Sequence, residues 1–254
     1  MRRSVRVSDG VYLAVVEFGG GGTPILLLHG LMGRATTWWP VARRLTGHGR
    51  SQASGPWTTA RMAADAAEVL DRLDAGPALV VGHSMGGLTG IELAARRPDL
   101  VRALVVEDAA ADLTCSPASA VTDARAWFAA IPQPFESLAA VREAFGSERP
   151  EFGEYMAECV EERADGFHLL CRVDNAVEIA AEWTRRAYWQ ALAAIRCPTL
   201  LVEAEKGIVP AGQGERMELV LLHGGRVVVE GTGHLVHAAA PDTFHSLLTT
   251  ALGA

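Results

Sequence analysis

The sequence predicts an α/β protein whose mostly parallel sheet is flanked by helices and interrupted by a helical insert. Five apolar runs that are too short for helices alternate with longer amphipathic segments, a pattern typical of parallel strands joined by crossover helices. Strand patterns then vanish between about residues 113 and 194, where only helical patterns remain. We therefore expect a core of residues 1–112 and 195–254 and a helical cap of residues 113–194.

The core elements follow one another in a regular order. Segments 4–7 and 11–18 flank the turn Ser8-Asp9-Gly10 and predict a β-hairpin. Crossover helices are expected over residues 58–73 and from Met85 to Arg97, where Pro98 ends the helix. The five core strands are expected at residues 25–28, 78–81, 103–106, 200–202 and 227–229.

The insert shows four helical patterns, at residues 124–130, 138–145, 152–163 and 176–186. A helical insert of about 80 residues inside a repeating βα pattern is expected to form a lid over the carboxyl edge of the sheet. Open α/β folds bind their ligands at that edge.

Composition argues against several classes of protein. The net charge of −7, without a basic patch, argues against nucleic-acid binding. No apolar run approaches the ~18 residues needed to span a bilayer, and no signal-peptide pattern follows Arg2 and Arg3. Lys206 is the only lysine, which is typical of a GC-rich bacterial gene. We expect a cytoplasmic protein without a membrane partner.

The cysteines show no metal-binding pattern. None of the four lies in a Cys-x-x-Cys motif, so we expect small buried thiols in a reducing compartment and no metal site. They are Cys115, Cys159, Cys171 and Cys197.

A nucleophilic serine is predicted at Ser84. The motif Gly82-His83-Ser84-Met85-Gly86 follows an apolar strand and opens a helix, as in a nucleophile elbow. The tight turn needs small flanking residues and projects the hydroxyl above the sheet. The helix N-terminus beneath it favours a developing negative charge.

A serine hydroxyl needs a neighbouring base to take its proton. His234 follows the last strand pattern in the segment Gly231-Thr232-Gly233-His234, on a loop from which it can reach the serine. We assign His234 as the base. His237 is expected to be a structural histidine, and His83 is expected to pack beside the elbow.

Together with His29-Gly30 after the 25–28 strand, the loop 47–51 and Pro241 after His234, these motifs resemble the α/β-hydrolase superfamily over the whole chain. The resemblance implies that Ser84 is the nucleophile and His234 the base. It also implies an oxyanion hole formed by the backbone N–H groups of Leu31 and Met85.

The third member of the triad departs from the usual family pattern. Most members carry an aspartate after the next-to-last strand, where this chain has Gly207. A minority place the acid after the strand that follows the elbow helix, and Asp108 lies there, 24 positions after Ser84. We assign Asp108 as the acid. Glu205 is the main rival, Glu107 is a further candidate, and a site without any acid is the remaining alternative.

A second departure concerns the sheet. Relatives have a further parallel strand between His29-Gly30 and the 47–51 loop, but only 17 positions separate Gly30 from Gly47. A crossover needs about a dozen residues before its strand begins, so we predict that one inner strand is missing. Either the N-terminal hairpin has shifted inward, or a partner chain such as a second copy in a homodimer fills the gap, or the chain has been altered.

A serine nucleophile favours acyl transfer. We predict hydrolysis of a carboxylic ester, lactone or thioester of an apolar small molecule through an acyl-enzyme, without a metal or organic cofactor. The expected substrate contacts are the aromatic side chains of Trp38, Trp127 and Trp183. The alternatives are carbon–carbon bond hydrolysis or acyl transfer by the same triad, a lyase reaction, or a catalytically impaired binding protein.

Overall fold

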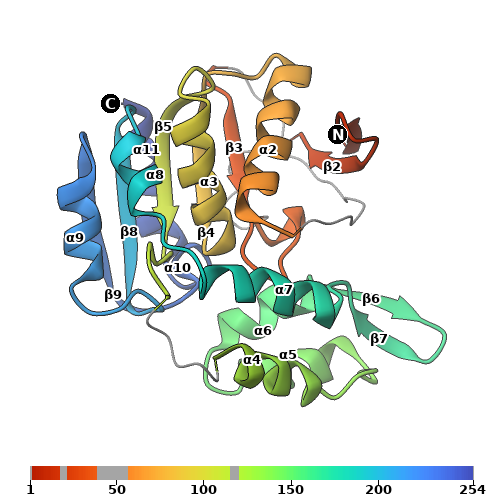
Figure 1. Ribbon diagram of the computed structural model, residues 1–254. Coiled ribbons are helices and arrows are strands. Elements are labelled where there is room, and N and C mark those ends of the chain that lie inside the picture. The colour runs from red at the N-terminus through yellow and green to blue at the C-terminus, as the bar shows by residue number, and fades with distance from the viewer. Residues whose placement is uncertain (1, 18–21, 39–56, 115–119, 254) are drawn as a thin grey trace.

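A five-stranded parallel sheet forms the centre of the molecule (Figure 1). The computed structural model describes residues 2–17, 22–38, 57–114 and 120–253. Every neighbouring pair in the sheet order β3-β4-β5-β8-β9 is parallel. The five strands are β3 (Ile25–Leu28), β4 (Ala78–His83), β5 (Val101–Glu107), β8 (Thr199–Lys206) and β9 (Gly224–Gly233). The predicted fold class and all five strand positions are confirmed.

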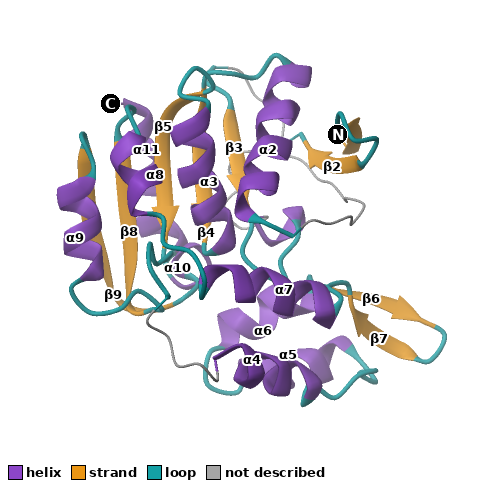
Figure 2. Cartoon of the chain, viewed as in Figure 1, coloured by secondary structure: helices purple, strands orange, loops and turns teal. Residues whose placement is uncertain are grey.

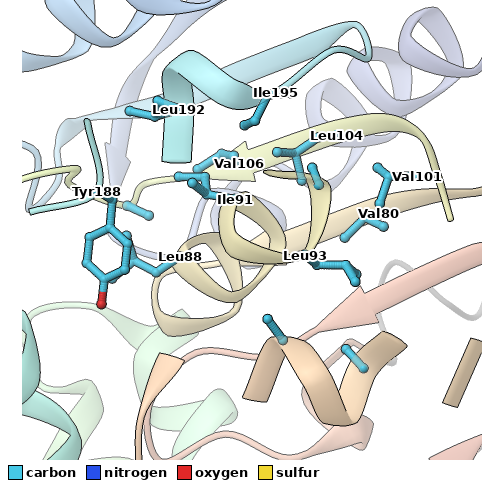
Figure 3. Packing of buried hydrophobic residues seen from close by; sticks show 14 of the residues in the cluster. Val80, Leu88, Ile91, Leu93, Val101, Leu104, Val106, Tyr188, Leu192 and Ile195 are labelled. Carbon is cyan, nitrogen blue, oxygen red and sulfur yellow. The ribbon is translucent and has the colours of Figure 1, made fainter. Parts of the chain in front are cut away.

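Helices cover both faces of this sheet, which explains why its strands are continuous apolar runs. In β4, Val80 packs into the apolar cluster on one face and Leu79 into the cluster on the other, and both are fully buried. Figure 3 shows the first cluster, in which Ile91 and Leu192 lie against Val80, Leu104 and their neighbours. The helices on that face are α2 (Thr59–Leu73), α3 (Met85–Arg96), α8 (Trp189–Ala194) and α9 (Gln213–Val220). On the other face are η1 (Ala35–Trp38), α10 (Val236–Ala239) and α11 (Pro241–Gly253).

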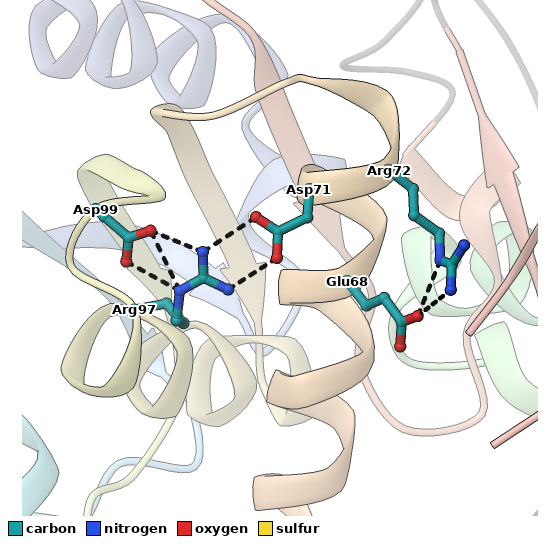
Figure 4. Close-up of polar contacts among 5 residues, drawn as sticks. All are labelled: Glu68, Asp71, Arg72, Arg97 and Asp99. Atoms are coloured by element: carbon teal, nitrogen blue, oxygen red, sulfur yellow. Dashed lines mark hydrogen bonds and ion pairs between the residues drawn. The ribbon is translucent and has the colours of Figure 1, made fainter. Parts of the chain in front are cut away.

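The crossover helices begin and end close to the expected residues. Helix α2 begins after Thr58, whose hydroxyl accepts a hydrogen bond from the Arg61 N–H at 3.2 Å, as an N-cap does. Arg97 follows the end of α3 and binds both Asp71 of α2 and Asp99 (Figure 4). Among the described helices, none combines the length and apolarity that crossing a bilayer requires.

The elements from α4 to α7, which follow β5 in the chain, lie beyond the carboxyl ends of the strands (Figure 2). We call these elements the insert; they are α4 (Ala120–Ala129), α5 (Leu138–Gly146), α6 (Pro150–Ala157), β6 (Val160–Arg163), β7 (Gly166–Leu169) and α7 (Val173–Trp183). The division of the chain at residues 113 and 194 stays a prediction.

The expectation of a purely helical insert is wrong. Helix α6 ends at Ala157, and β6 and β7 form an antiparallel hairpin where the sequence analysis continued a helix to residue 163. Gly166 has a φ of 132°, a backbone conformation that glycine adopts readily. The turn consists of Ala164 and Asp165, and Gly166 begins β7. Asp and Gly are typical turn residues, and Asp165-Gly166 is the signal that the helical periodicity obscured.

The predicted N-terminal hairpin is confirmed, but it stands apart from the central sheet. Strands β1 (Arg2–Arg6) and β2 (Tyr12–Val16) form their own two-stranded antiparallel sheet. Among the described strands β3 is therefore one edge of the central sheet, and the hairpin has not moved inward beside it. The loop 47–51 and residues 39–46 of the stretch in which we predicted a missing strand lie outside the described residues.

Hydrogen bonds tie the two ends of the insert together where the chain leaves and re-enters the core. The Tyr188 N–H donates to the Ala111 carbonyl at 2.7 Å, and Trp189 Nε1 donates to the Asp112 carboxylate at 2.9 Å. The Gln213 side chain, at the start of α9, pairs with both backbone groups of Asp112 at 2.9 Å. The entry and the exit of the insert are thereby fixed to each other and to α9.

Candidate active site

Ser84 lies in a strained turn between β4 and α3. Its φ of 53° and ψ of −116° are unusual for any residue other than glycine. The Ser84 N–H donates to the Glu107 carbonyl at 2.8 Å, which ties the turn to β5. A Cβ on Gly86 would lie 2.5 Å from the Leu28 carbonyl carbon, so only glycine lets the start of α3 approach β3 this closely. The local geometry is that of a nucleophile elbow.

His234 and Asp108 form a carboxylate–histidine pair beside this turn. His234 Nδ1 donates to Asp108 Oδ2 at 2.6 Å. The fully buried Asp108 carboxylate also accepts the Ala204 N–H at 3.2 Å and the Ile208 N–H at 3.0 Å. Since Nδ1 carries the hydrogen, the lone pair on Nε2 of His234 is free to take a proton.

Gly207 leaves room for the Asp108 carboxylate at the end of β8. A Cβ at this position would lie 2.5 Å from both Cγ and Oδ2 of Asp108 and closer still to Oδ1. The Asp108 carboxylate thus occupies the space into which a side chain at residue 207 would extend. The two positions follow the adjacent strands β5 and β8, so an acid from either strand reaches the same place.

The rival acids contact other groups. Glu205 accepts the Gly231 N–H at 2.8 Å from an exposed position. Glu107 binds His237 rather than His234. Of the three candidates that the sequence offered, Asp108 is the one in contact with His234.

His83 joins the base loop to the elbow. Its Nε2 is 2.9 Å from the His234 carbonyl oxygen, and the two rings lie 4.5 Å apart. Burial lowers the pKa of His83 well below its usual value, and the positive charges of protonated His234 and His237 would lower it further. His83 is therefore neutral and donates from Nε2. This contact holds His234 next to the residue that precedes Ser84.

The two expected oxyanion donors lie beside Ser84. Met85 is the first residue of α3, so its N–H has no acceptor within the helix. A Cβ on Gly30 would lie 3.3 Å from the Ser84 Cβ, which places the loop leading into Leu31 directly against the elbow. Their role in an oxyanion hole stays a prediction.

The three predicted tryptophans do not come together. Trp38 is 1% exposed and stacks on His237 at 4.4 Å, so its ring packs in the core and has no face for a ligand. Trp183 packs against the cluster on the α3 face. Trp127 is 47% exposed on α4 and contacts Phe128.

Tyr155 of α6 also lies at the site, a contact that the sequence does not predict. Its buried ring comes so close to the loop after Gly30 that a Cβ on Gly33 would collide with the hydroxyl. Burial raises the pKa of Tyr155, so the hydroxyl keeps its proton at neutral pH. A lone tyrosine in a helical pattern gives no signal of such a contact.

The insert packs against both loops of the site. Met32, which follows Leu31, and Leu235, which follows His234, belong to the same apolar cluster as Met156 and Val177 of the insert. Buried apolar side chains therefore join the insert to the loops on which Leu31 and His234 lie.

Comparisons with known proteins identify the family to which the chain belongs. A model of the alpha/beta hydrolase family matches residues 25–247. The chain belongs to the alpha/beta hydrolase family. The expected resemblance is thereby confirmed.

Several relatives in the family are hydrolases. The chain is 38% identical to lipase LipV of Mycobacterium tuberculosis over 123 residues, which are 44% of this chain and 47% of the lipase, so the matched stretch spans less than half of that relative. It is 28% identical to the putative carbamate hydrolase RutD of Enterobacter cloacae over 91% of this chain and 92% of that protein. The crystal structure of E-2-(acetamidomethylene)succinate hydrolase superposes with a TM-score of 0.86 over 100% of this chain and 99% of that one. Its 24% identity shows the shared fold alone.

Proposed function

We propose that this family member is a serine hydrolase that cleaves a carboxylic ester, lactone or thioester of an apolar small molecule through an acyl-enzyme. The observation that supports it best is the 2.6 Å hydrogen bond between His234 Nδ1 and Asp108 Oδ2, beside Ser84 in its strained turn. An activated serine needs such a base, held in one tautomer by a carboxylate.

The reaction would proceed in two half-reactions. Ser84 Oγ attacks the carbonyl carbon while His234 Nε2 takes the hydroxyl proton, and the N–H groups of Leu31 and Met85 stabilise the oxyanion. The bond from the carbonyl carbon to the leaving oxygen or sulfur then breaks, and His234 gives the proton to that atom. An alcohol or thiol departs, or a lactone ring opens to a hydroxyacyl group, and an acyl-Ser84 ester remains. A water molecule, deprotonated by His234, hydrolyses that ester and restores the free serine.

The names of the relatives support the acyl class of substrate. They include the Mycobacterium tuberculosis lipase, an esterase from the same organism and, among solved structures, an enol-lactonase from Burkholderia xenovorans. The cluster that contains Met32 and Leu235 supports an apolar acyl group. Because RutD is named as a putative carbamate hydrolase, the substrate panel includes an aryl carbamate.

Labelling with a fluorophosphonate tests this proposal. The probe phosphonylates only an activated serine, so peptide mass mapping should find it on Ser84 in the wild type and nowhere in Ser84→Ala or His234→Ala. Hydrolysis is measured in parallel on p-nitrophenyl esters of increasing acyl length, a thioester, a lactone and an aryl carbamate. A folded wild-type protein that neither labels nor hydrolyses any ester, thioester, lactone or carbamate refutes the proposed function.

A further inference from the structure

Two adjacent residues at the end of β5 bind two different histidines. Asp108 binds His234, and Glu107, directly before it, binds His237. Glu107 is the last residue of β5, whereas Asp108 follows the strand with a φ of 43°, outside the strand conformation. The backbone turns at Asp108, and the two carboxylates bind different histidines. The two histidines lie three positions apart, on either side of the start of α10.

Glu107 holds His237 by both its backbone and its ring. Glu107 Oε1 accepts the His237 backbone N–H at 2.8 Å, and His237 Nδ1 lies 2.9 Å from Oε1 and 2.8 Å from Oε2. Both residues are fully buried. The N–H of the second residue of α10 would otherwise have no acceptor within the helix, so Glu107 fixes the helix that follows the base.

The same group of side chains also holds the base itself. His83 donates to the His234 carbonyl, and its ring meets that of His237 edge-on at 5.3 Å. Trp38 stacks on the far side of His237 at 4.4 Å. The backbone of His234 is thus held at its own carbonyl by His83 and three residues later by Glu107.

A buried carboxylate is a costly way to fill a core. Removing a charge from water costs free energy that its partners only partly return, and apolar replacements of such pairs are often as stable or more stable. Packing alone therefore gives no reason for Glu107 to be acidic. The carboxylate is explained instead by the hydrogen bonds that it makes to the segment after His234.

We propose that Glu107 and His237 are positioning residues, which hold the start of α10 so that His234 stays aligned between Asp108 and Ser84. This inference rests on the proposed function, because it assigns to His234 the role of base. It gives Glu107 a role different from that of the acid: Glu107 acts through His237 and the backbone and does not contact the reacting groups.

Glu107→Gln tests the inference, with Glu92→Gln as the matched control. Glu92 is an equally buried carboxylate on α3 that binds Arg96 and Arg186, away from the base loop. A displacement of about 1 Å in a reacting group costs on the order of 100-fold in rate. We expect Glu107→Gln to lower kcat by about 10- to 100-fold with KM within about twofold, and Glu92→Gln to leave both constants within about twofold.

A second pair of variants keeps the test valid if Glu107→Gln does not fold. His237→Asn places an amide N–H near the position of Nδ1 and is expected to retain at least a third of the wild-type kcat, whereas His237→Ala is expected to lose about 10- to 100-fold. A kcat for Glu107→Gln or His237→Ala equal to that of the control overturns the proposal. So does a loss of about 10⁴-fold in Glu107→Gln, which would make Glu107 the triad acid.

An inactive wild type would refute the proposed function but would not decide whether Glu107 positions His234. Proton NMR tests this positioning without turnover. The Nδ1 protons of His234 and His237 are expected as two slowly exchanging downfield signals. Glu107→Gln should speed the exchange of the His234 proton although Asp108 is intact. An unchanged His234 signal in that variant overturns the proposal.

Discussion

Replacing Gly207 with alanine should impair catalysis because the new methyl group would collide with the Asp108 carboxylate. The added Cβ would lie 2.5 Å from Cγ and Oδ2 of Asp108, about 0.9 Å closer than the 3.4 Å at which ordinary contact begins. The carboxylate is held by the N–H groups of Ala204 and Ile208 and by His234, so moving it strains or breaks these bonds.

A shift of about 1 Å predicts a loss of about 10²-fold in kcat/KM, and complete loss of the acid predicts about 10⁴-fold. These factors correspond to about 2.7 and 5.4 kcal/mol of transition-state stabilisation. Steady-state hydrolysis of a p-nitrophenyl ester measures the effect. Gly225→Ala on the neighbouring strand β9 is the control, since its Cβ would meet only Leu200 at 3.8 Å, and it should change kcat/KM less than about twofold.

Moving the acid gives the converse test. The double variant Asp108→Gly with Gly207→Asp places the carboxylate on β8, and we expect it to be at least about tenfold more active than Asp108→Gly alone. If Gly207→Ala folds with the wild-type Tm and keeps kcat/KM within threefold, the collision has no consequence for catalysis and the reasoning is refuted.

Three further outcomes are expected. Asp108→Asn should lower kcat by about 10³- to 10⁴-fold, whereas Glu205→Gln should change it less than about threefold. Steady-state kinetics compares the two variants. A larger loss of kcat in Glu205→Gln than in Asp108→Asn would make Glu205 the acid. Leu104→Ala should lower the free energy of unfolding by about 2–5 kcal/mol because the residue is fully buried between helices and sheet, and a loss below about 1 kcal/mol in urea titrations would contradict that packing. Asp71→Asn should lower the free energy of unfolding by at most about 1 kcal/mol at pH 7. The hydrogen bonds from Arg97 lower the pKa of Asp71 in the folded protein. The greater stability of the wild type should therefore be present above the ordinary aspartate pKa of about 3.9 and disappear as the pH falls through the lowered folded value. Urea titrations at neutral and acidic pH check this sign, and an advantage that persists in acid contradicts it.

Local sequence patterns predicted the core of the fold and the residues that the structure brings together at the candidate site. Strand β4 is buried on both faces, so its first four residues form a continuous apolar run. A strand with one exposed face would alternate apolar and polar residues instead. The elbow at Ser84 has glycines at fixed offsets because the approach of α3 to β3 leaves no room for a Cβ. The spacing of Asp108 from Ser84 follows from the fixed path of α3 and β5 between them.

What the sequence did not reveal depends on contacts across the fold. Hairpin strands of four residues are too short for their alternation to stand out from a helical period, so β6 and β7 were hidden. Glu107 and His237 are 130 positions apart, and no local sequence pattern around either residue predicts their contact. Gly207 stands where most family members carry the acid, which suggested that the acid is missing. The structure shows that the Asp108 carboxylate fills the space that a side chain at residue 207 would occupy.

The hydrogen bonds that join Ala111 to Tyr188 and Asp112 to Trp189 have a consequence for how such a molecule can diverge. They hold residues 111–112 next to residues 188–189. The core therefore contacts the same pair of segments whatever the length of the chain between them. The entropic cost of closing a loop grows only with the logarithm of its length. The chain between these two segments can therefore change in length at little cost to the sheet, provided that the contacts of the insert with Met32 and Leu235 are kept.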